Sequence, residues 1–346
     1  MRWSMRLLFT LLLLVGWSVL IYFYADHTLQ SPQRDKPIVL EIPHGASSTE
    51  IGQLLEKNGL IRSDRFFNIY IRLTGATNAL QAGVYEIPPD KNLEGILQIM
   101  ASGKQNTFRV TIPEGFTVKQ IADRLAEHGI NRDQFLEAVE KESFDYEFVK
   151  ELDNTDKRLY RLEGYLFPST YEIPKGASPE EIIDIMLKEF DKRLQRDGVK
   201  EKLKERNLTV DKWVTIASIV EREGQVSEEL PRISGVIHNR LERGMPLQVD
   251  ATIQYLRGEQ KARLMYKDLE VDSPYNTYKV KGLPPGPISS PGEAALNAVL
   301  EPEDHEYLYY VTKKDGSKLH YFSKTYKEHL ALKSKSEKNQ TQTSGQ

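Results

Sequence analysis

The chain of 346 residues contains no cysteine. This absence excludes disulfide-stapled folds, cysteine metal sites, cysteine nucleophiles and lipid attachment through an N-terminal cysteine. A strong charge of either sign is also lacking, because 47 Lys and Arg oppose 50 Asp and Glu and leave a net charge of −3. A protein that binds nucleic acid through bulk positive charge is therefore not expected.

Several catalytic signatures are missing as well. The seven histidines form no His-x-x-x-His pair, which would present two metal ligands on one helix face. There is no Gly-x-Ser-x-Gly nucleophile elbow and no phosphate-binding loop of the Walker type. We therefore expect neither a cofactor nor a metal site.

One long uncharged run stands out, from Leu7 to Tyr24, and its 18 residues are about the minimum for crossing a bilayer. Arg2 and Arg6 precede it, and the first acid after it is Asp26. The positive-inside rule then predicts that residues 1–6 are cytoplasmic and that everything after residue 24 is extracytoplasmic, or periplasmic.

A cleaved signal peptide has the same charge pattern and is the main alternative. Its apolar core is usually shorter, at ~7–15 residues, and ends in a small-x-small site. The stretch Tyr22–Asp26 offers only Ala25 as a small residue. We therefore favour an uncleaved single span, residues 7–24, in the cytoplasmic (inner) membrane, followed by a polar linker, residues 25–37.

The chain beyond the linker repeats itself loosely. Residues 38–61 align with residues 108–130, for example Pro43 with Pro113. Each copy predicts a short strand, a Gly-containing turn and an amphipathic helix. The helices would begin at Thr49 or Thr117 and end at the C-cap glycines Gly59 or Gly129.

A second matching pair strengthens the repeat. Residues 85–88 and 171–174 both read Tyr-Glu-Ile-Pro, and each leads into an apolar helix that we expect to end near Met100 or Met186. Such βα units resemble LysM-type glycan-binding modules. We assign residues 38–105 to a LysM-like domain and residues 106–200 to a second βα-repeat segment. Duplicated spacer units that bind nothing remain the alternative.

From about residue 201 the sequence pattern changes from βα units to mainly helical segments. Helices are predicted over residues 209–222, 231–243 and 250–256, followed by a long Pro- and Gly-rich loop, residues 275–291. Another helix opens at Pro291 and Glu293, and residues 307–311 and 319–322 predict a β-hairpin. We expect an α+β fold with a mixed helical and hairpin catalytic domain over residues 201–330, and a disordered tail over residues 331–346.

Glu221 is the first candidate for chemistry. Helical spacing places it above Ala217 and Ser218, on or beside an apolar face. A carboxylate in such surroundings tends to have a raised pKa and can act as a general acid. Glu223 lies about 200° further round the helix, which makes it the better candidate for a solvated charge. Periodicity alone also permits an ordinary glutamate at the edge of an amphipathic helix.

Two further polar segments are candidates for binding sugars. Amide and charged groups gather around a predicted helix end and the start of the next helix: Asn239, Arg240, Gln248 and Asp250. The loop that follows supplies aromatic faces and a further amide: Tyr275, Asn276 and Tyr278. Read alone, the first segment is a polar connector and the second a rigid structural corner.

Taken together these segments resemble the YceG-like family of endolytic murein transglycosylases. The resemblance is carried by six stretches in order: ASIVERE (217–223), NRLERGMPLQVD (239–250), SPYNTY (273–278), GLPPGPI (282–288), YLYYV (307–311) and HYFSKTYKEH (320–329). It covers the chain to about Leu330. Asp250-Ala251 departs from the Asp-Pro common in the family, but it leaves the carboxylate in place.

The resemblance implies cleavage of the β-1,4 bond between N-acetylmuramic acid and N-acetylglucosamine within a peptidoglycan strand. The family's catalytic glutamate falls on Glu221, which would protonate the glycosidic oxygen and then accept the proton of the muramoyl C6 hydroxyl. That hydroxyl closes a 1,6-anhydro ring, so the second carboxylate of hydrolytic glycosidases is not needed. Peptidoglycan synthases are candidate partners, and limiting the length of nascent strands is the candidate role.

Two other readings stay open. The first is a non-catalytic peptidoglycan-binding scaffold of the wall-synthesis machinery, which would need no acid at Glu221. The second is a pyridoxal-phosphate lyase, a label sometimes attached to the family. It would need a Schiff-base lysine, and an extracytoplasmic domain is an awkward place for that chemistry.

Overall fold

The computed structural model describes residues 2–43, 45–76, 80–101, 106–152, 157–258 and 264–343. The chain divides into two compact units. The first consists of residues 1–109 with 172–177, and the second of residues 110–171 with 178–346. The strand pair that joins the two units is formed by β3 (Thr107–Thr111) and β4 (Thr170–Pro174).

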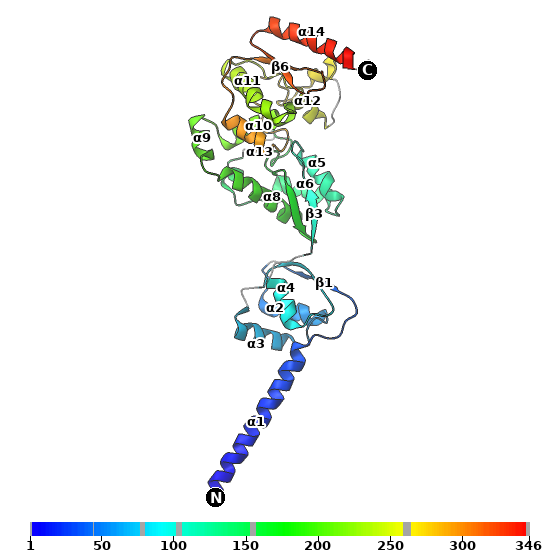
Figure 1. Cartoon of the computed structure of the whole chain (residues 1–346), viewed down its shortest axis with the longest axis vertical. Helices are drawn as coiled ribbons and strands as arrows, with labels where there is room; N and C mark the ends of the chain where they lie inside the picture. The colour runs from blue at the N-terminus through cyan, green and yellow to red at the C-terminus, as the bar shows by residue number, and fades with distance from the viewer. Residues whose placement is uncertain are drawn as a thin grey trace. The chain divides into compact units, whose positions relative to one another are not determined.

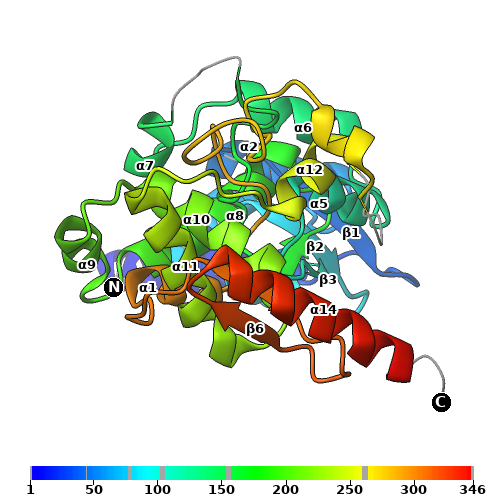
Figure 2. The ribbon, with the colours of Figure 1, turned by 90° about the horizontal axis from the view of Figure 1, so that it is seen from above.

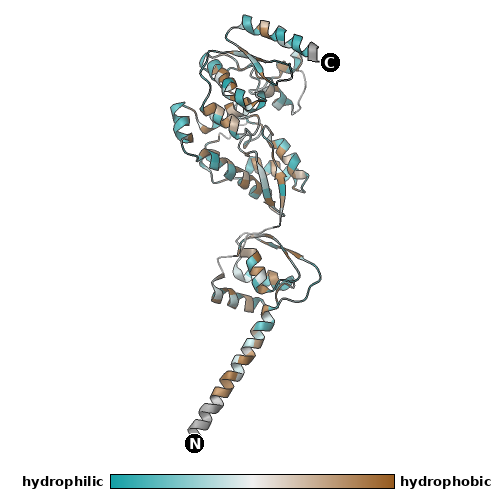
Figure 3. Cartoon of the chain, in the orientation of Figure 1, coloured by the Kyte–Doolittle hydropathy of each residue, from teal (hydrophilic) through white to brown (hydrophobic). Residues whose placement is uncertain are grey.

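The first unit begins with the long helix α1, Arg2–Leu29, which extends into the segment expected to be a linker. Residues 11–29 are apolar and long enough to span a membrane. Most of their side chains are exposed, as at Leu14 and Trp17, which are 65% and 64% exposed. Figure 3 shows this apolar stretch in brown, giving way to hydrophilic colour toward the end of the helix.

A small α+β domain follows α1. Its elements are β1 (Ile38–Ile42), α2 (Ser48–Lys57), α3 (Asp64–Thr74), β2 (Gly83–Ile87) and α4 (Leu93–Ala101). β1 and β2 pair antiparallel, with Leu40 opposite Tyr85. α2 packs against α3 and β1, and α4 packs against β2 (Figure 1).

The repeat detected in the sequence returns as a repeated order of elements. After β3 come α5 (Val118–Ala126), α6 (Arg132–Lys141), the single turn α7 (Glu147–Lys150), β4 and α8 (Pro179–Leu194). Both copies therefore run strand, helices, strand, helix, and in both the two strands pair with each other.

The ends of the matched helices show why the repeat was readable. Thr117 caps α5 as expected, but α2 is capped by Ser47 rather than Thr49, because Ser47 Oγ accepts from the Glu50 amide in a capping box. Gly59 lies in the left-handed region just beyond α2, and the Leu60 amide reaches back to Leu55 O at 2.9 Å. Gly129 closes α5 in the same way.

Helix α8 is two turns longer than expected. It was predicted to end near Met186 but continues to Leu194. Ile182, Met186, Phe190 and Leu194 follow one another at helical spacing and are all buried. This continuous apolar face stabilises the extra turns.

The second unit is built around α10, Val210–Glu223, with Thr209 as its N-cap. Every residue from Trp213 to Val220 is buried. α10 packs against α11 (Leu230–Glu242) and α13 (Glu293–Leu300). Trp213 Nε1 donates to Leu296 O of α13 at 2.9 Å. α9 (Val199–Glu205) packs against α13, and α12 spans Asp250–Arg257. The predicted helices of this region are thus present.

The C-terminal elements pack on one another. β5 (Tyr309–Thr312) and β6 (His320–Ser323) form the predicted antiparallel hairpin. α14, Tyr326–Thr343, runs beside it (Figure 2). Residues 331–343, expected to be disordered, are therefore helical. Ser336 Oγ donates to Thr312 O at 2.6 Å, and Asn339 Nδ2 donates to Lys313 O at 2.7 Å. No local sequence pattern predicts these contacts.

A close approach in the second unit depends on Gly164. Its φ is +87°, and a Cβ built there would lie 2.5 Å from Pro287 Cβ and 2.9 Å from Val214 Cγ1. The segment that contains Gly164 is thus pressed against both α10 and the Pro-rich loop.

We expect Gly164→Ala to lower the free energy of unfolding of the second unit by about 2–5 kcal/mol, because left-handed strain and overpacking both destabilise. Urea unfolding followed by the fluorescence of Trp213, which is 1% exposed, measures this. Gly198→Ala is the matched control, since Gly198 has φ +82° but open space around it. Equal losses in the two variants would contradict the close approach.

Candidate active site

Glu221 lies in the last turn of α10, where the helix meets the loop that precedes α13. Its Oε2 accepts a hydrogen bond from the backbone N–H of Gly292 at 3.0 Å. The carboxyl group is therefore turned toward this loop, as expected from its place beside the apolar face of α10.

The Pro- and Gly-rich loop is held against α10 by its backbone. Ile288 N donates to Ser218 Oγ at 3.0 Å, and Ser289 Oγ donates to Ser218 O at 3.3 Å. The fixed path of the loop brings Gly292 to Glu221. Since Ser218 and Glu221 are three residues apart, they project from the same side of the helix.

A second loop, after β3, completes the surroundings of Glu221. Gly115 N donates to Ser290 O at 2.8 Å, and Ser290 N donates to Phe116 O at 2.7 Å. Arg222 Nη1 donates to Gly115 O at 3.2 Å. A Cβ on Gly292 would lie 1.9 Å from Glu114 Oε1, so only glycine lets Glu114 come this close.

These neighbours set the electrostatics of the site. Burial raises the pKa of Glu221, and the nearby carboxylate of Glu114 raises it further. The Gly292 N–H and the Arg222 guanidinium act in the opposite direction, but burial dominates the pKa. Glu221 thus holds its proton to a higher pH than an ordinary glutamate, which suits a general acid.

Glu223 is not the solvated residue that helix geometry suggested. Tyr310 of β5 donates its hydroxyl to Glu223 Oε2 at 2.8 Å. Burial raises the pKa of Glu223, and the negative charge of Asp250 raises it further. The expectation failed because the hairpin covers this side of α10, and α10's own sequence carries no sign of that contact.

Four of the predicted sugar-binding residues are engaged in structural contacts. Asn239 Nδ2 donates to His305 O at 2.7 Å, and Arg240 donates to Leu308 O and Leu247 O at 2.6 and 2.7 Å. Asn276 is fully buried, and its amide donates to Leu269 O and Val271 O. Tyr275 is buried against the ring of Tyr255.

The other three predicted residues are more accessible. Gln248 and Asp250 are exposed, and Gln248 has a φ of +51° in the turn before α12. Asp250 accepts a hydrogen bond from the Tyr278 hydroxyl. The negative charge of Asp250 is close enough to Glu223 to raise the pKa of that carboxyl group.

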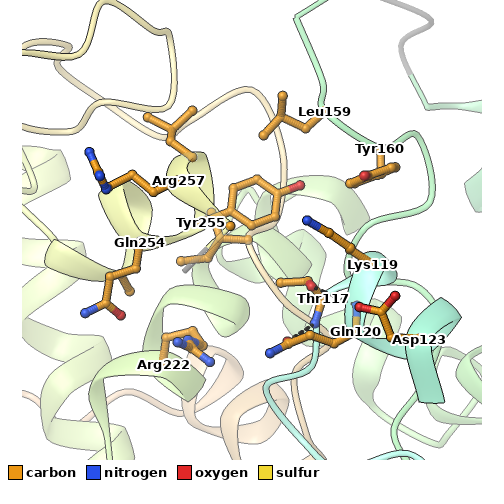
Figure 4. Close-up of a pocket in the computed structure, with 14 residues that line it drawn as sticks. Thr117, Lys119, Gln120, Asp123, Leu159, Tyr160, Arg222, Gln254, Tyr255 and Arg257 are labelled. Atoms are coloured by element: carbon orange, nitrogen blue, oxygen red, sulfur yellow. Dashed lines mark hydrogen bonds between the residues drawn. The ribbon is translucent and has the colours of Figure 1, made fainter. Parts of the chain in front are cut away.

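A cavity of about 610 Å³ opens in the second unit beside the last turn of α10. Arg222, the neighbour of Glu221 in the chain, lies on its wall (Figure 4). α5 contributes Lys119 and Gln120, and α12 contributes Gln254 and Tyr255 from the other side. Tyr160 adds a second aromatic ring. Cationic, amide and aromatic groups thus line one space.

A buried carboxylate supports this wall. Glu163 is fully buried, and Oε1 and Oε2 accept hydrogen bonds from Val118 N at 3.0 Å and from the Tyr255 hydroxyl at 3.0 Å. It therefore links the start of α5 to α12. Burial raises the pKa of Glu163 to about 8. Among the described residues, no group of three or more His, Cys, Asp or Glu is placed to hold a metal ion.

Residues 40–335 match the YceG-like family. The chain belongs to this family. A relative from Bacillus subtilis (strain 168), named endolytic murein transglycosylase, is 36% identical over 326 residues, which cover 91% of this chain and 89% of the relative.

Two further similarities extend the comparison. A relative of the same name from Streptococcus pneumoniae (strain D39) is 34% identical over 83% of this chain, and the match spans 56% of that longer relative. The crystal structure of a yceG-like protein from Listeria monocytogenes is 38% identical, covers 86% of this chain and 99% of its own, and has a TM-score of 0.58. The mixed helix and strand architecture is therefore shared with a solved relative.

Sequence reasoning missed the part of this site that α5 and the segment before β4 supply. Lys119, Gln120 and Tyr160 belong to the second repeat, which was assigned to a linking segment. A signal existed at Glu163, the single charge within the apolar run 162–171. A lone charge inside such a run indicates a buried, hydrogen-bonded group.

We expect Glu114→Gln to move the alkaline limb of the pH–activity profile to lower pH. The charge of Glu114 raises the pKa of Glu221, so its removal lowers that pKa, and the protonated acid is lost earlier as pH rises. The initial rate of glycan cleavage across pH measures this. Glu142→Gln, at an exposed position elsewhere in the second unit, is the control. An unmoved limb would show that Glu114 does not act on the acid.

Proposed function

We propose that this chain is a membrane-anchored endolytic lytic transglycosylase that cleaves the N-acetylmuramic acid–β-1,4–N-acetylglucosamine bond within peptidoglycan strands. The observation that carries the proposal is a partly buried carboxyl group with a raised pKa, Glu221, whose neighbour Arg222 lines a cavity with a polar and aromatic lining. Relatives with the name endolytic murein transglycosylase, at 34% and 36% identity, support the same reaction.

Glu221 acts as both acid and base in this reaction. Protonated Glu221 donates its proton to the glycosidic oxygen as the bond from that oxygen to C1 breaks. The resulting carboxylate then accepts the proton of the muramoyl C6 hydroxyl, whose oxygen bonds to C1 and closes the 1,6-anhydro ring. No water is consumed, and Glu221 ends the cycle protonated as it began.

The surroundings of Glu221 suit this cycle. The Gly292 N–H holds Oε2 and so orients the carboxyl group, which leaves Oε1 for proton transfer. A raised pKa keeps the acid form available, yet the Gly292 N–H and the positive charge of Arg222 stabilise the carboxylate that forms midway. Hydrolytic glycosidases place a second carboxylate on the other side of the bond, whereas an internal hydroxyl nucleophile needs only one.

The cavity provides the means to hold sugar rings. Tyr160 and Tyr255 offer aromatic faces, while Lys119, Gln120 and Gln254 offer donors for hydroxyl and acetamido groups. Asp250, Tyr278 and Gln248 stay candidates for orienting the strand, because they are not buried. Asn239, Arg240 and Asn276 act by fixing the backbone that carries those groups, and Tyr275 by packing against the ring of Tyr255.

The location of the enzyme forms part of the proposal. α1 crosses the cytoplasmic membrane once, with the N-terminus in the cytoplasm and the catalytic unit outside, where new glycan strands emerge. The LysM-like units of the first and second repeats bind or space the strand. Together they set the reach of Glu221 and so limit the length of nascent strands, with peptidoglycan synthases as candidate partners.

Replacing Glu221 by glutamine tests the reaction. We expect Glu221→Gln to release anhydro-ended fragments from purified murein at least ~10²-fold more slowly, since general acid–base catalysis contributes about that factor or more. Mass spectrometry of the digest identifies the ends. Glu228→Gln, at an exposed glutamate just beyond α10, is the matched control.

The digest also separates the alternatives. A non-catalytic scaffold would release no fragments from either protein. Fragments that have gained a water would indicate a hydrolase, and anhydro product from Glu221→Gln at the wild-type rate would show that another residue is the acid.

The anchor is tested in cells. Residues 2–29 are replaced by a cleavable export signal, or by an unrelated single span of the same length as the control. We expect the freed enzyme to give a broader distribution of glycan strand lengths, because its reach is no longer limited by the bilayer, whereas the control keeps the wild-type lengths. Unchanged lengths in the freed enzyme would count against a measuring role for the anchor.

A further inference from the structure

An apolar stripe on helix α3 is only partly covered in the first unit. Phe66, Ile69, Tyr70 and Leu73 follow one another at helical spacing; Phe66 and Tyr70 pack against the core of the first unit, whereas Ile69 and Leu73 point away from it. Ile69 is 58% exposed and Leu73 82% exposed. Two large exposed aliphatic side chains on one short helix require a partner surface or a function.

This stripe begins where α1 ends. The ring of Tyr24, in the last turns of α1, meets the ring of Phe66 edge to face at 6.3 Å between centroids. Arg62 Nε donates to Gln30 O at 3.1 Å, and Leu29 packs against the core of the first unit. The candidate span and α3 are therefore directly joined, so a bilayer around α1 ends close to α3.

Two arginines lie beside the exposed aliphatic side chains of the stripe. Arg62, Arg65 and Arg72 are exposed on or next to α3. In the part of the chain that the structure describes, neither Arg65 nor Arg72 makes an ion pair. The acids nearby are Asp64 and Glu56 at the start of α3, Asp26 in the last turn of α1, and Glu94, whose Oε1 accepts a hydrogen bond from the Tyr70 hydroxyl at 2.8 Å. Arg65 and Arg72 lie four and three residues from Ile69, on its side of the helix, so their guanidinium groups complement an anionic surface at that place.

We propose that α3 lies on the outer surface of the membrane and binds anionic phospholipid, with Ile69 and Leu73 in the acyl boundary and Arg65 and Arg72 on the headgroups. This rests on the anchoring part of the proposed function. An apolar helix face lined with cations is the pattern of an interfacial helix, which is buried ~5–10 Å into the headgroup region. Contact with both α1 and the lipid surface then holds the first unit at one orientation to the bilayer.

Lipid is favoured over a protein partner by two observations. The stripe continues directly from the span, so the bilayer surface is within its reach without any further component. Arg65 and Arg72 lie beside the exposed Ile69, where cations are attracted by the negative surface potential of anionic lipid. A protein partner remains a distinguishable outcome of the test.

The absence of cysteine makes the test direct. Full-length protein carrying Leu73→Cys is labelled with an environment-sensitive fluorophore and reconstituted in phosphatidylcholine vesicles with an equal part of phosphatidylglycerol. Quenching by lipids that carry a nitroxide near the headgroup is then measured. Val39→Cys is the matched control, because Val39 is 60% exposed but lies on β1, pointing away from the core. Leu14→Cys, in α1, reports insertion of the span.

We expect the label at position 73 to be quenched several-fold more than the label at position 39. Strong quenching at position 14 with equal, weak quenching at 73 and 39 would overturn the docking while leaving the anchor intact. Weak quenching at position 14 as well would overturn the anchor and the docking together. If the fluorophore at position 73 reports an apolar environment in cell membranes but not in vesicles of pure lipid, lipid docking would be overturned in favour of a protein partner. A murein digest with the same samples reports the activity independently.

The charge complementarity is tested separately. The double variant Arg65→Gln, Arg72→Gln keeps the apolar stripe and removes two exposed charges. We expect quenching at position 73 to fall toward the control level in vesicles with phosphatidylglycerol and to lose its dependence on that lipid. Quenching that stays independent of phosphatidylglycerol in the parent labelled protein would overturn the headgroup assignment.

Discussion

The hydrogen bond from the Gly292 N–H to Glu221 joins the two segments on which the candidate site depends. It exists because the Pro- and Gly-rich loop docks on Ser218, one turn before Glu221 on the same side of α10. Docking shields part of the carboxyl group from solvent, and this burial raises its pKa. One contact between a rigid loop and a helix end therefore sets position, orientation and protonation together.

The rest of the second unit holds this contact in place. The loop after β3 bonds to Ser290 through Gly115 and Phe116, and Glu114 reaches the acid because Gly292 has no side chain. The hairpin encloses Glu223 on another side of α10, so that carboxyl group is held by Tyr310. Two glutamates on one helix turn thus have different surroundings: the loop before α13 holds Glu221, and the hairpin holds Glu223.

Local structure could be read from the sequence wherever the signal is local. The helix ends at Thr117, Thr209 and Gly129 were predictable because capping involves residues three or four positions apart. The uncharged run and the repeated strand–helix order were equally visible. The predictions for Glu223 and for the tail were wrong for one reason. Each of these segments packs against the β5–β6 hairpin, and the residues that it contacts there lie 87 and 24 positions away in the chain.

Most elements, the candidate span and the candidate acid Glu221 could be predicted from the sequence, because periodicity, caps and motif order are properties of neighbouring residues. The groups that line the cavity beside the last turn of α10 come together only in the folded chain. Lys119 and Tyr160 meet Tyr255 across the cavity, and Glu163 bonds both α5 and α12. Such contacts arise from the packing of segments that are distant in the chain. Burial raises the pKa values of these carboxyl groups, and it exists only once those segments have packed.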